Sequence, residues 1–108
     1  MSFIATENKG FRMKFENGFT ISVQWGTMNY CSKKNLGAEY GDEMKEQIWE
    51  SPSAEIAVFD TIGEIVHIGD DDAVIGWLSA DEVAKVIAIV SSAANENEIK
   101  LKIKALKI

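Results

Sequence analysis

The side chains best suited to holding a small ligand lie between Gln24 and Lys34, where the sequence is QWGTMNYCSKK. Aromatic rings can stack on a nucleobase, amide groups can hydrogen-bond its edge, and lysines can neutralise phosphate. The candidate ligand contacts are Gln24, Trp25, Asn29, Tyr30, Lys33 and Lys34, together with Arg12 on the strand expected to pair beside them. Structural roles are the alternative: Trp25 continues an apolar face, Asn29 can cap a turn, and a lysine pair is commonly solvated.

This stretch opens a long connection, residues 26–53, which shows no sustained apolar period. Compact domains rarely carry a connection of this length without a use for it. The connection is therefore the first place to look for a site. Within it, residues 40–49 are expected to form a short helix that ends before Pro52. Trp49, like Trp77 further along, is expected to fill the core.

The sequence contains few residues suited to catalysis or to metal binding. The single His, His67, and the single Cys, Cys31, do not suffice for a zinc site. Nothing near either residue supports a Cys31–His67 nucleophile pair, so His67 is expected to be a structural or surface-facing strand residue. Asp70–Asp72 lacks the spaced ligands of a calcium loop, and no phosphate-binding glycine motif occurs. We therefore expect a protein that is not an enzyme and has no metal or cofactor.

The composition limits the possible class. The 108 residues, 46% of them hydrophobic, indicate one domain, residues 1–108. The net charge of −6 disfavours duplex nucleic acid, because affinity for a phosphate backbone comes from clustered Lys and Arg. No apolar run reaches the roughly 18 residues of a membrane span, and the N-terminus does not resemble a signal peptide. With one cysteine and no internal disulfide, a cytoplasmic location without membrane contact is expected.

The first clear element is a hairpin. Residues 11–15 and 19–25 alternate apolar and polar side chains, as half-buried strands do. A two-residue loop would place Phe15 opposite Thr20 and break the match between apolar faces. A three-residue loop pairs Phe15 with Phe19 instead. It predicts a type I turn with Gly18 left-handed in a G1 bulge.

A second hairpin is predicted from residues 55–60 and 64–68, and a further strand from residues 73–78. Ser79 then begins a capping box with Glu82, and the apolar spacing after it predicts a helix that runs to about Ala94.

The tail, residues 98–108, again alternates, with Ile99, Leu101 and Ile103 on one phase and lysines on the other. This pattern predicts a last strand, which could pair within its own subunit or add to the sheet of a neighbour. The expected fold class is α+β: a twisted antiparallel sheet of five to six strands with one long helix from the C-terminal half packed on it.

Three segments together resemble a widespread family of small proteins from tailed bacteriophages. They are FRMKFENGFTISVQWGTMNYCS (11–32), AEIAVFDTIGEIVHIGDD (54–71) and VIGWLSADEVAKVIAIV (74–90). The pattern is similar to that of the anti-CBASS sponge family, whose members bind cyclic nucleotide signals and deny them to host immune effectors. This resemblance implies a homo-oligomer, dimer or tetramer, in the host cytoplasm. It implies binding of a cyclic dinucleotide or related small nucleotide without catalysis.

The resemblance supplies no ligand residues, so the contacts proposed above come from the residue types alone. Two other functions fit a small acidic phage protein. One is an inhibitor that covers a basic surface of a host protein, and the other is a virion accessory protein.

Overall fold

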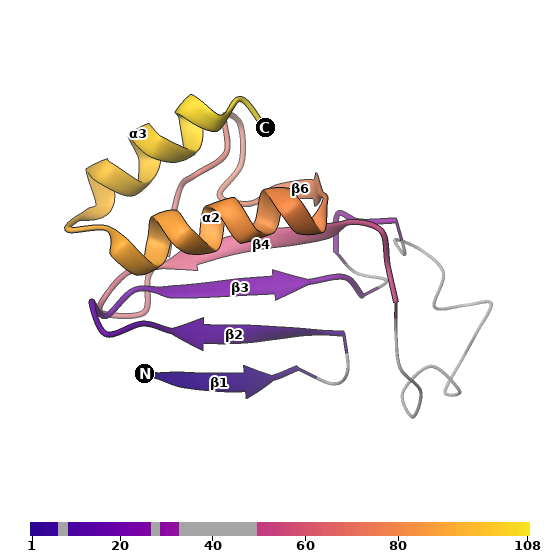
Figure 1. Ribbon diagram of the computed structural model, residues 1–108, viewed down its shortest axis with the longest axis horizontal. Helices are drawn as coiled ribbons and strands as arrows, with labels where there is room; N and C mark the ends of the chain where they lie inside the picture. The colour runs from indigo at the N-terminus through magenta and orange to yellow at the C-terminus, as the bar shows by residue number, and fades with distance from the viewer. Residues whose placement is uncertain (7–8, 27–28, 33–49) are drawn as a thin grey trace.

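The computed structural model describes residues 1–6, 9–26, 29–32 and 50–108. Its elements in chain order are β1 (Ser2–Ala5), β2 (Gly10–Lys14), β3 (Thr20–Gln24), β4 (Ala54–Phe59), β5 (Ile65–Val66), β6 (Ile75–Leu78), α2 (Ala80–Ser92) and α3 (Glu96–Leu106). A 6-stranded antiparallel sheet carries both helices on one face (Figure 1). The predicted α+β class is confirmed. The expected helix at 40–49 and Trp49 lie outside the described residues.

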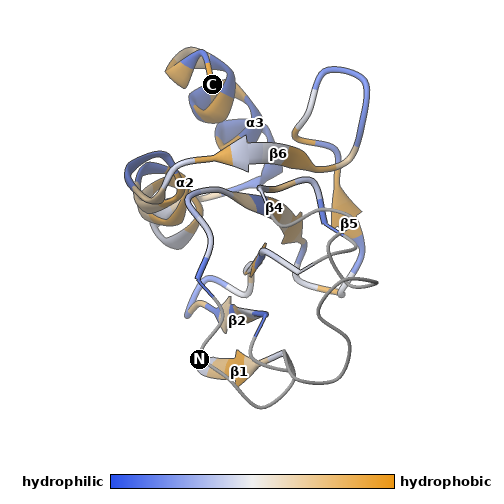
Figure 2. Cartoon of the chain, turned by 90° about the vertical axis from the view of Figure 1, so that its right-hand side faces the viewer, coloured by the Kyte–Doolittle hydropathy of each residue, from blue (hydrophilic) through white to orange (hydrophobic). Residues whose placement is uncertain are grey.

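The strands follow the order β1-β2-β3-β4-β5, and β6 also pairs with β4. One edge of β4 pairs continuously with β3 from Glu55 to Phe59. The other edge is divided, because β5 pairs with Val58 and Phe59 whereas β6 pairs with Ala54 and Ile56. Strand β1, for which the sequence analysis made no prediction, forms the opposite edge of the sheet and pairs with β2. Figure 2 shows β1 at the end of the sheet farthest from the helices.

The first hairpin has the predicted register. Phe11 pairs with Val23 and Met13 with Ile21. The Phe15 N–H donates to the Phe19 carbonyl at 2.9 Å, which closes the three-residue loop. Gly18 has a φ of 92°, in the left-handed region that glycine adopts without a steric penalty. The predicted bulge at Gly18 is confirmed.

The core lies between the helices and one face of the sheet. Helix α2 packs on β3 and β4, and α3 packs on α2. The buried residues that meet there share apolar character and alternate along the strands: Phe19, Ile21, Val23, Ile56, Val58, Val83, Val86, Val90, Ile99 and Ile103. The capping box is also present, because the Glu82 N–H donates to the Ser79 hydroxyl at 3.2 Å and the Ser79 N–H to the Glu82 carboxylate at 2.9 Å. These bonds set where α2 begins.

The tail differs from its prediction. Residues 96–106 form helix α3, so no C-terminal strand exists to join a sheet. Asn95 caps the helix by accepting from the Glu98 N–H at 2.9 Å. Ile99 and Ile103 are buried, whereas Leu101 is 68% exposed. Positions four apart share a face of a helix and also of a strand, which is why the alternation was misleading. The prediction of a last strand, within or between subunits, is wrong.

Candidate functional site

The expected ligand contacts do not converge on one face of the sheet. Strand side chains alternate between faces, and Trp25 follows Val23 on the helix-covered face. Arg12 and Gln24 have the opposite parity and lie on the other face with Ser22, because Arg12 pairs with Ser22. Lys33 and Lys34 lie outside the described residues. The structure therefore separates Trp25 from Arg12 and Gln24 by the thickness of the sheet.

Arg12 and Gln24 both interact within the protein. The Arg12 guanidinium lies over the Phe59 ring, 5.1 Å from its centroid. The Gln24 carbonyl oxygen accepts from the Thr6 hydroxyl at 3.0 Å, and its amide nitrogen donates to the Ser22 hydroxyl at 3.2 Å. These contacts stabilise the face of the sheet opposite the helices and use the amide that was expected to read a base edge.

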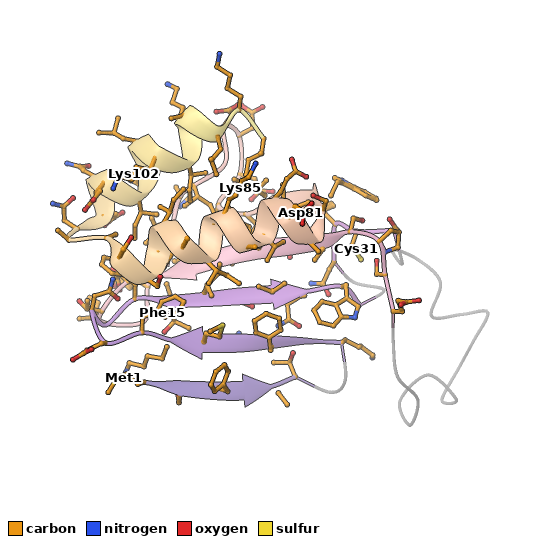
Figure 3. The ribbon with its side chains drawn as sticks, in the orientation of Figure 1. Met1, Phe15, Cys31, Asp81, Lys85 and Lys102 are labelled. Carbon is orange, nitrogen blue, oxygen red and sulfur yellow. The ribbon has the colours of Figure 1, made fainter. Side chains whose placement is uncertain are left out.

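Asn29 and Tyr30 are anchored by one carboxylate. The Asn29 amide donates to one oxygen of Glu55 at 3.3 Å, and the Tyr30 N–H donates to the other oxygen at 3.0 Å. Cys31 is fully buried, and its thiol donates to the Gly26 carbonyl at 3.4 Å. Figure 3 shows Cys31 at the end of the molecule where α2 begins. Glu55 therefore holds Asn29 and Tyr30 against the sheet, and Tyr30 is 44% exposed.

A bulge in β6 contacts the same segment. The register between β4 and β6 shifts between Ala54 and Ile56. Trp77 within the bulge has a φ of 61°, and its N–H donates to the Tyr30 carbonyl at 2.9 Å instead of to β4. A Cβ at Gly76 would collide with the Tyr30 side chain, so this close approach needs glycine. Trp77 is 58% exposed, and its expected role as core filler is wrong.

Trp25 lines an open groove of about 500 Å³ beneath the first turns of α2. We call it the Trp25 groove. It is lined by the strand residues Phe11, Val23 and Trp25, the segment 50–54, and the helix residues Ala80, Val83, Ala84 and Ile87. The Phe11 and Trp25 rings meet edge to face with centroids 6.2 Å apart. Helix residues as small as Ala80 and Ala84 leave the space above these rings open. Trp25 itself is partly buried and packs against the core.

The wall formed by the segment before β4 is held by its own hydrogen bonds. The Ser51 hydroxyl donates to the Ser53 carbonyl at 2.7 Å and accepts from the Ser53 N–H at 3.3 Å. The Ser32 N–H donates to the Ser53 hydroxyl at 2.9 Å. These hydrogen bonds hold this wall of the groove in place. Among its described lining residues Glu50 is the one charged side chain.

A second hollow, of about 530 Å³, lies between residues 67–76 and α3. We call it the α3 hollow. Lys100 and Lys104 line it from α3 and Lys107 from the C-cap of that helix, with Asp70–Asp72 and His67 on the other side. Within the described part of the chain, α3 forms the ion pairs Lys100–Glu96 and Lys102–Glu98, whereas none joins its lysines to the acidic turn. The alternation of the tail did not predict this hollow, because it placed the lysines on a strand.

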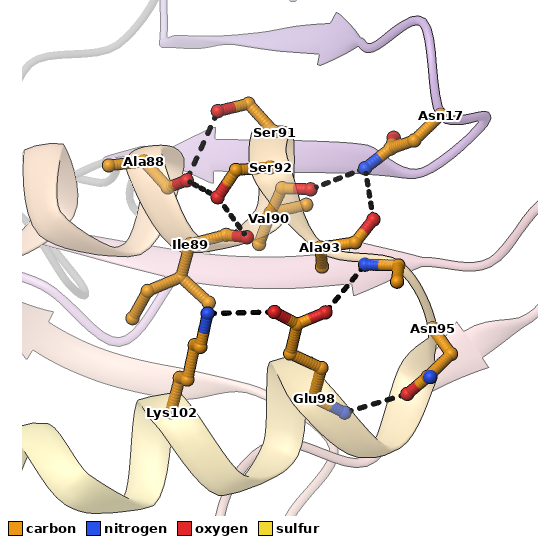
Figure 4. A network of polar contacts seen from close by, with 11 residues as sticks. Asn17, Ala88, Ile89, Val90, Ser91, Ser92, Ala93, Asn95, Glu98 and Lys102 are labelled. Atoms are coloured by element: carbon orange, nitrogen blue, oxygen red, sulfur yellow. Dashed lines mark hydrogen bonds and ion pairs between the residues drawn. The ribbon is translucent and has the colours of Figure 1, made fainter.

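Glu98 lies in the first turn of α3, and among the described residues it is the ionisable group whose pKa clearly shifts. Its carboxylate accepts from the Ala94 N–H at 2.6 Å and from the Lys102 ammonium at 2.7 Å. Both contacts, the backbone hydrogen bond first, lower the pKa of Glu98 below its ordinary value of 4.5. Figure 4 shows this carboxylate between the two donors.

Across residues 1–6, 9–26, 29–32 and 50–108, no three His, Cys, Asp or Glu side chains are grouped so as to hold a metal ion. No helix in the same ranges is long and apolar enough to cross a membrane. Scans against family models, curated proteins and solved structures find no match to this chain. The two hollows are therefore the features of the described structure that indicate a function.

Proposed function

We propose that this chain is a non-catalytic binding protein that captures a small cyclic nucleotide, with a base of the ligand in the Trp25 groove. One observation carries the proposal: the groove has an aromatic wall, Phe11 and Trp25, beneath a helix surface of small residues. Stacking a base on an aromatic side chain contributes about 1–3 kcal/mol. The volume of about 500 Å³ falls among pockets that hold small ligands.

The phosphates of such a ligand need cations that the described part of the groove does not contain. Arg12 lies on the other face of the sheet, over Phe59. The expected phosphate contacts within this proposal are thus Lys33 and Lys34. Capture without transformation fits a phage protein that withholds an immune signal in the host cytoplasm, as the sequence resemblance implies.

The groove can be blocked without removing a core residue. Ala84 lines it from α2, whereas Ala88, one turn later on the same helix, is exposed and does not. We expect Ala84→Leu to weaken binding of labelled cyclic dinucleotides at least about tenfold in equilibrium dialysis, with Ala88→Leu as the matched control at wild-type affinity. Trp25→Ala should weaken binding similarly, because it removes the stacking surface. Heating should release the ligand intact.

Three outcomes contradict the proposal. If neither cyclic mononucleotides nor cyclic dinucleotides bind at micromolar concentration, the ligand is not a cyclic nucleotide. Release of a cleaved product makes the protein an enzyme. Loss of binding in Lys104→Ala, with Ala84→Leu unaffected, moves the ligand from the Trp25 groove to the α3 hollow.

A second candidate function, inhibition of a host protein, is favoured by the same lining. The described groove holds apolar side chains and Glu50 but neither Lys nor Arg, which suits an apolar side chain of a partner with a basic surface. A pull-down from host lysate with wild-type protein, Ala84→Leu and Ala88→Leu tests this candidate. It requires a partner that Ala84→Leu alone fails to retain.

A further inference from the structure

Strand β1 forms an unprotected edge of the sheet. Phe3 is 81% exposed and Ile4 48% exposed, and every residue of the strand is exposed. Proteins commonly protect such edges with charged side chains, proline or a bulge. The β1 sequence, SFIA, contains no charge and no proline, and its register with β2 is continuous. Figure 1 shows β1 along the open side of the sheet.

Among the described residues, the outward backbone groups of β1 have no hydrogen-bond partner on that edge. The Thr6 N–H donates to the Gly10 carbonyl at 3.1 Å, so the backbone N–H and C=O groups of Thr6 point toward β2. Antiparallel pairs alternate between hydrogen-bonded and non-hydrogen-bonded positions. Ile4 lies two residues earlier and pairs with Arg12, so its backbone N–H and C=O groups also point toward β2. The N–H and C=O groups of Phe3 and Ala5 point away from the sheet.

Strand β1 presents an apolar side chain on each face of the sheet beside this edge. Phe3 pairs with Met13 on the helix-covered face, and Ile4 pairs with Arg12 on the other. The Arg12 guanidinium does not reach toward the edge, because it lies over Phe59 on β4, on the far side of β3. A strand that pairs here meets no charged side chain from β1.

We propose that β1 pairs antiparallel with β1 of a second copy of this chain, about a two-fold axis at Ile4. This register places Phe3 of each copy opposite Ala5 of the other, so that the outward N–H and C=O groups of both residues exchange hydrogen bonds. The two Ile4 side chains meet at the axis in a non-hydrogen-bonded pair, where side chains approach most closely. The two sheets become one continuous sheet.

Side-chain size and charge favour a second copy over a foreign strand. Ala5 pairs with Phe11, so each Phe3 ring finds the small Ala5 between itself and Phe11 of the other copy. The strand brings no charge to the seam. Lys14 pairs with Ser2, so the axis sets the two Lys14 side chains at opposite ends of the seam, about 13 Å or more apart along the strand. This inference does not depend on the ligand of the Trp25 groove.

The test uses the full chain in analytical ultracentrifugation from 1 to 500 µM. We expect the mass to rise from that of a monomer toward twice that value. Ala5→Pro removes an outward N–H without breaking a bond to β2, and Phe3→Asp places a charge at the seam; both variants should remain monomeric. Ile62→Asp is the control, because Ile62 is 77% exposed elsewhere, and it should dimerise as the wild type does. Circular dichroism verifies that each variant is folded.

A disulfide tests the register itself. Residues facing each other in a non-hydrogen-bonded pair have Cα atoms about 4.5 Å apart, within the range that a disulfide spans. Ile4→Cys should therefore form a covalent dimer under mild oxidation, whereas Ile62→Cys should not. A wild-type chain that stays monomeric at 500 µM overturns the proposal, and so does a dimer that persists in both Ala5→Pro and Phe3→Asp. Crosslinking through Phe3→Cys but not Ile4→Cys overturns the Ile4 axis.

Discussion

The side-chain amide of Asn17 donates to the Val90 carbonyl at 2.8 Å, which joins the first hairpin to the end of α2 (Figure 4). The same nitrogen donates to the Ala93 carbonyl at 3.0 Å. Carbonyls in the last turn of a helix have no partner within the helix. Asn17 supplies one, and its own carbonyl oxygen accepts from the Phe19 N–H at 3.1 Å.

Asn17→Ala should therefore destabilise the protein by about 1–3 kcal/mol, because it removes the side-chain partner of the Val90 carbonyl, the Ala93 carbonyl and the Phe19 N–H. Asn17→Asp should also be destabilising at pH 7, since a carboxylate would face carbonyl oxygens at the negative end of α2. Urea unfolding measures both variants. Equal stability of Asn17→Asp and wild type would contradict this role.

Gly18 and Gly63 both have a positive φ, but a side chain would meet a steric clash only at Gly18. Comparing alanine substitutions at the two positions therefore separates the cost of the backbone conformation from the cost of the clash. Gly63, at φ 88°, has open space where a Cβ would lie, whereas a Cβ at Gly18, at φ 92°, would come within 2.8 Å of the Thr61 methyl group. Gly63→Ala should cost about 1 kcal/mol from backbone conformation alone. Gly18→Ala should cost more. Adding Thr61→Ser to Gly18→Ala removes the methyl group and should restore the stability lost to the clash. Thermal unfolding of the three variants checks this order, and a cost at Gly63 equal to that at Gly18 would argue against the clash.

Glu55 should control the order of the 29–32 segment. Glu55→Ala removes the acceptors of the Asn29 amide and the Tyr30 N–H. We expect faster hydrogen exchange at the Tyr30 amide, together with a loss of stability of about 1–3 kcal/mol. Glu64→Ala, at an exposed position, is the control. Unchanged exchange at Tyr30 in Glu55→Ala would show that other contacts hold the segment.

The pKa of Glu98 makes stability depend on pH. Because the folded-state pKa lies below the ordinary value of 4.5, the ionised carboxylate stabilises the fold above that pH. This contribution is lost as the pH falls through the lowered pKa. Glu98→Gln should therefore have a lower melting temperature than wild type at pH 7, and the two curves should converge in acid. A difference that stays constant from pH 7 to pH 2.5 would exclude the carboxylate charge as its cause.

Local patterns in the sequence predicted the parts of the fold that depend on neighbouring residues. Opposed apolar pairs determined the loop beside Gly18, and Ser79 with Glu82 marked the start of α2. The tail failed because Ile99 and Ile103 satisfy two periods at once. Asn95, a capping residue followed three positions later by Glu98, was the signal that favoured a helix.

The candidate site was less predictable. The parity of the predicted strands already separated Trp25 from Arg12 and Gln24, so this division could have been inferred from the first hairpin. The exposure of Trp77 could not, because it results from a bulge whose N–H bonds to Tyr30, a contact between residues far apart in the sequence. The Trp25 groove likewise requires α2 to lie above the sheet.

The divided edge of β4 affects how copies of this chain can assemble. On that side the sheet ends in two short strands, β5 and β6, and the β6 residue Trp77 already bonds to Tyr30. In the part of the chain that the structure describes, β1 is thus the one border of the sheet formed by a single continuous strand. When each subunit has a single edge that can pair, assembly stops at a dimer because pairing occupies that edge in both copies. Fibres, which need two such sides, are disfavoured by the same geometry that favours a pair.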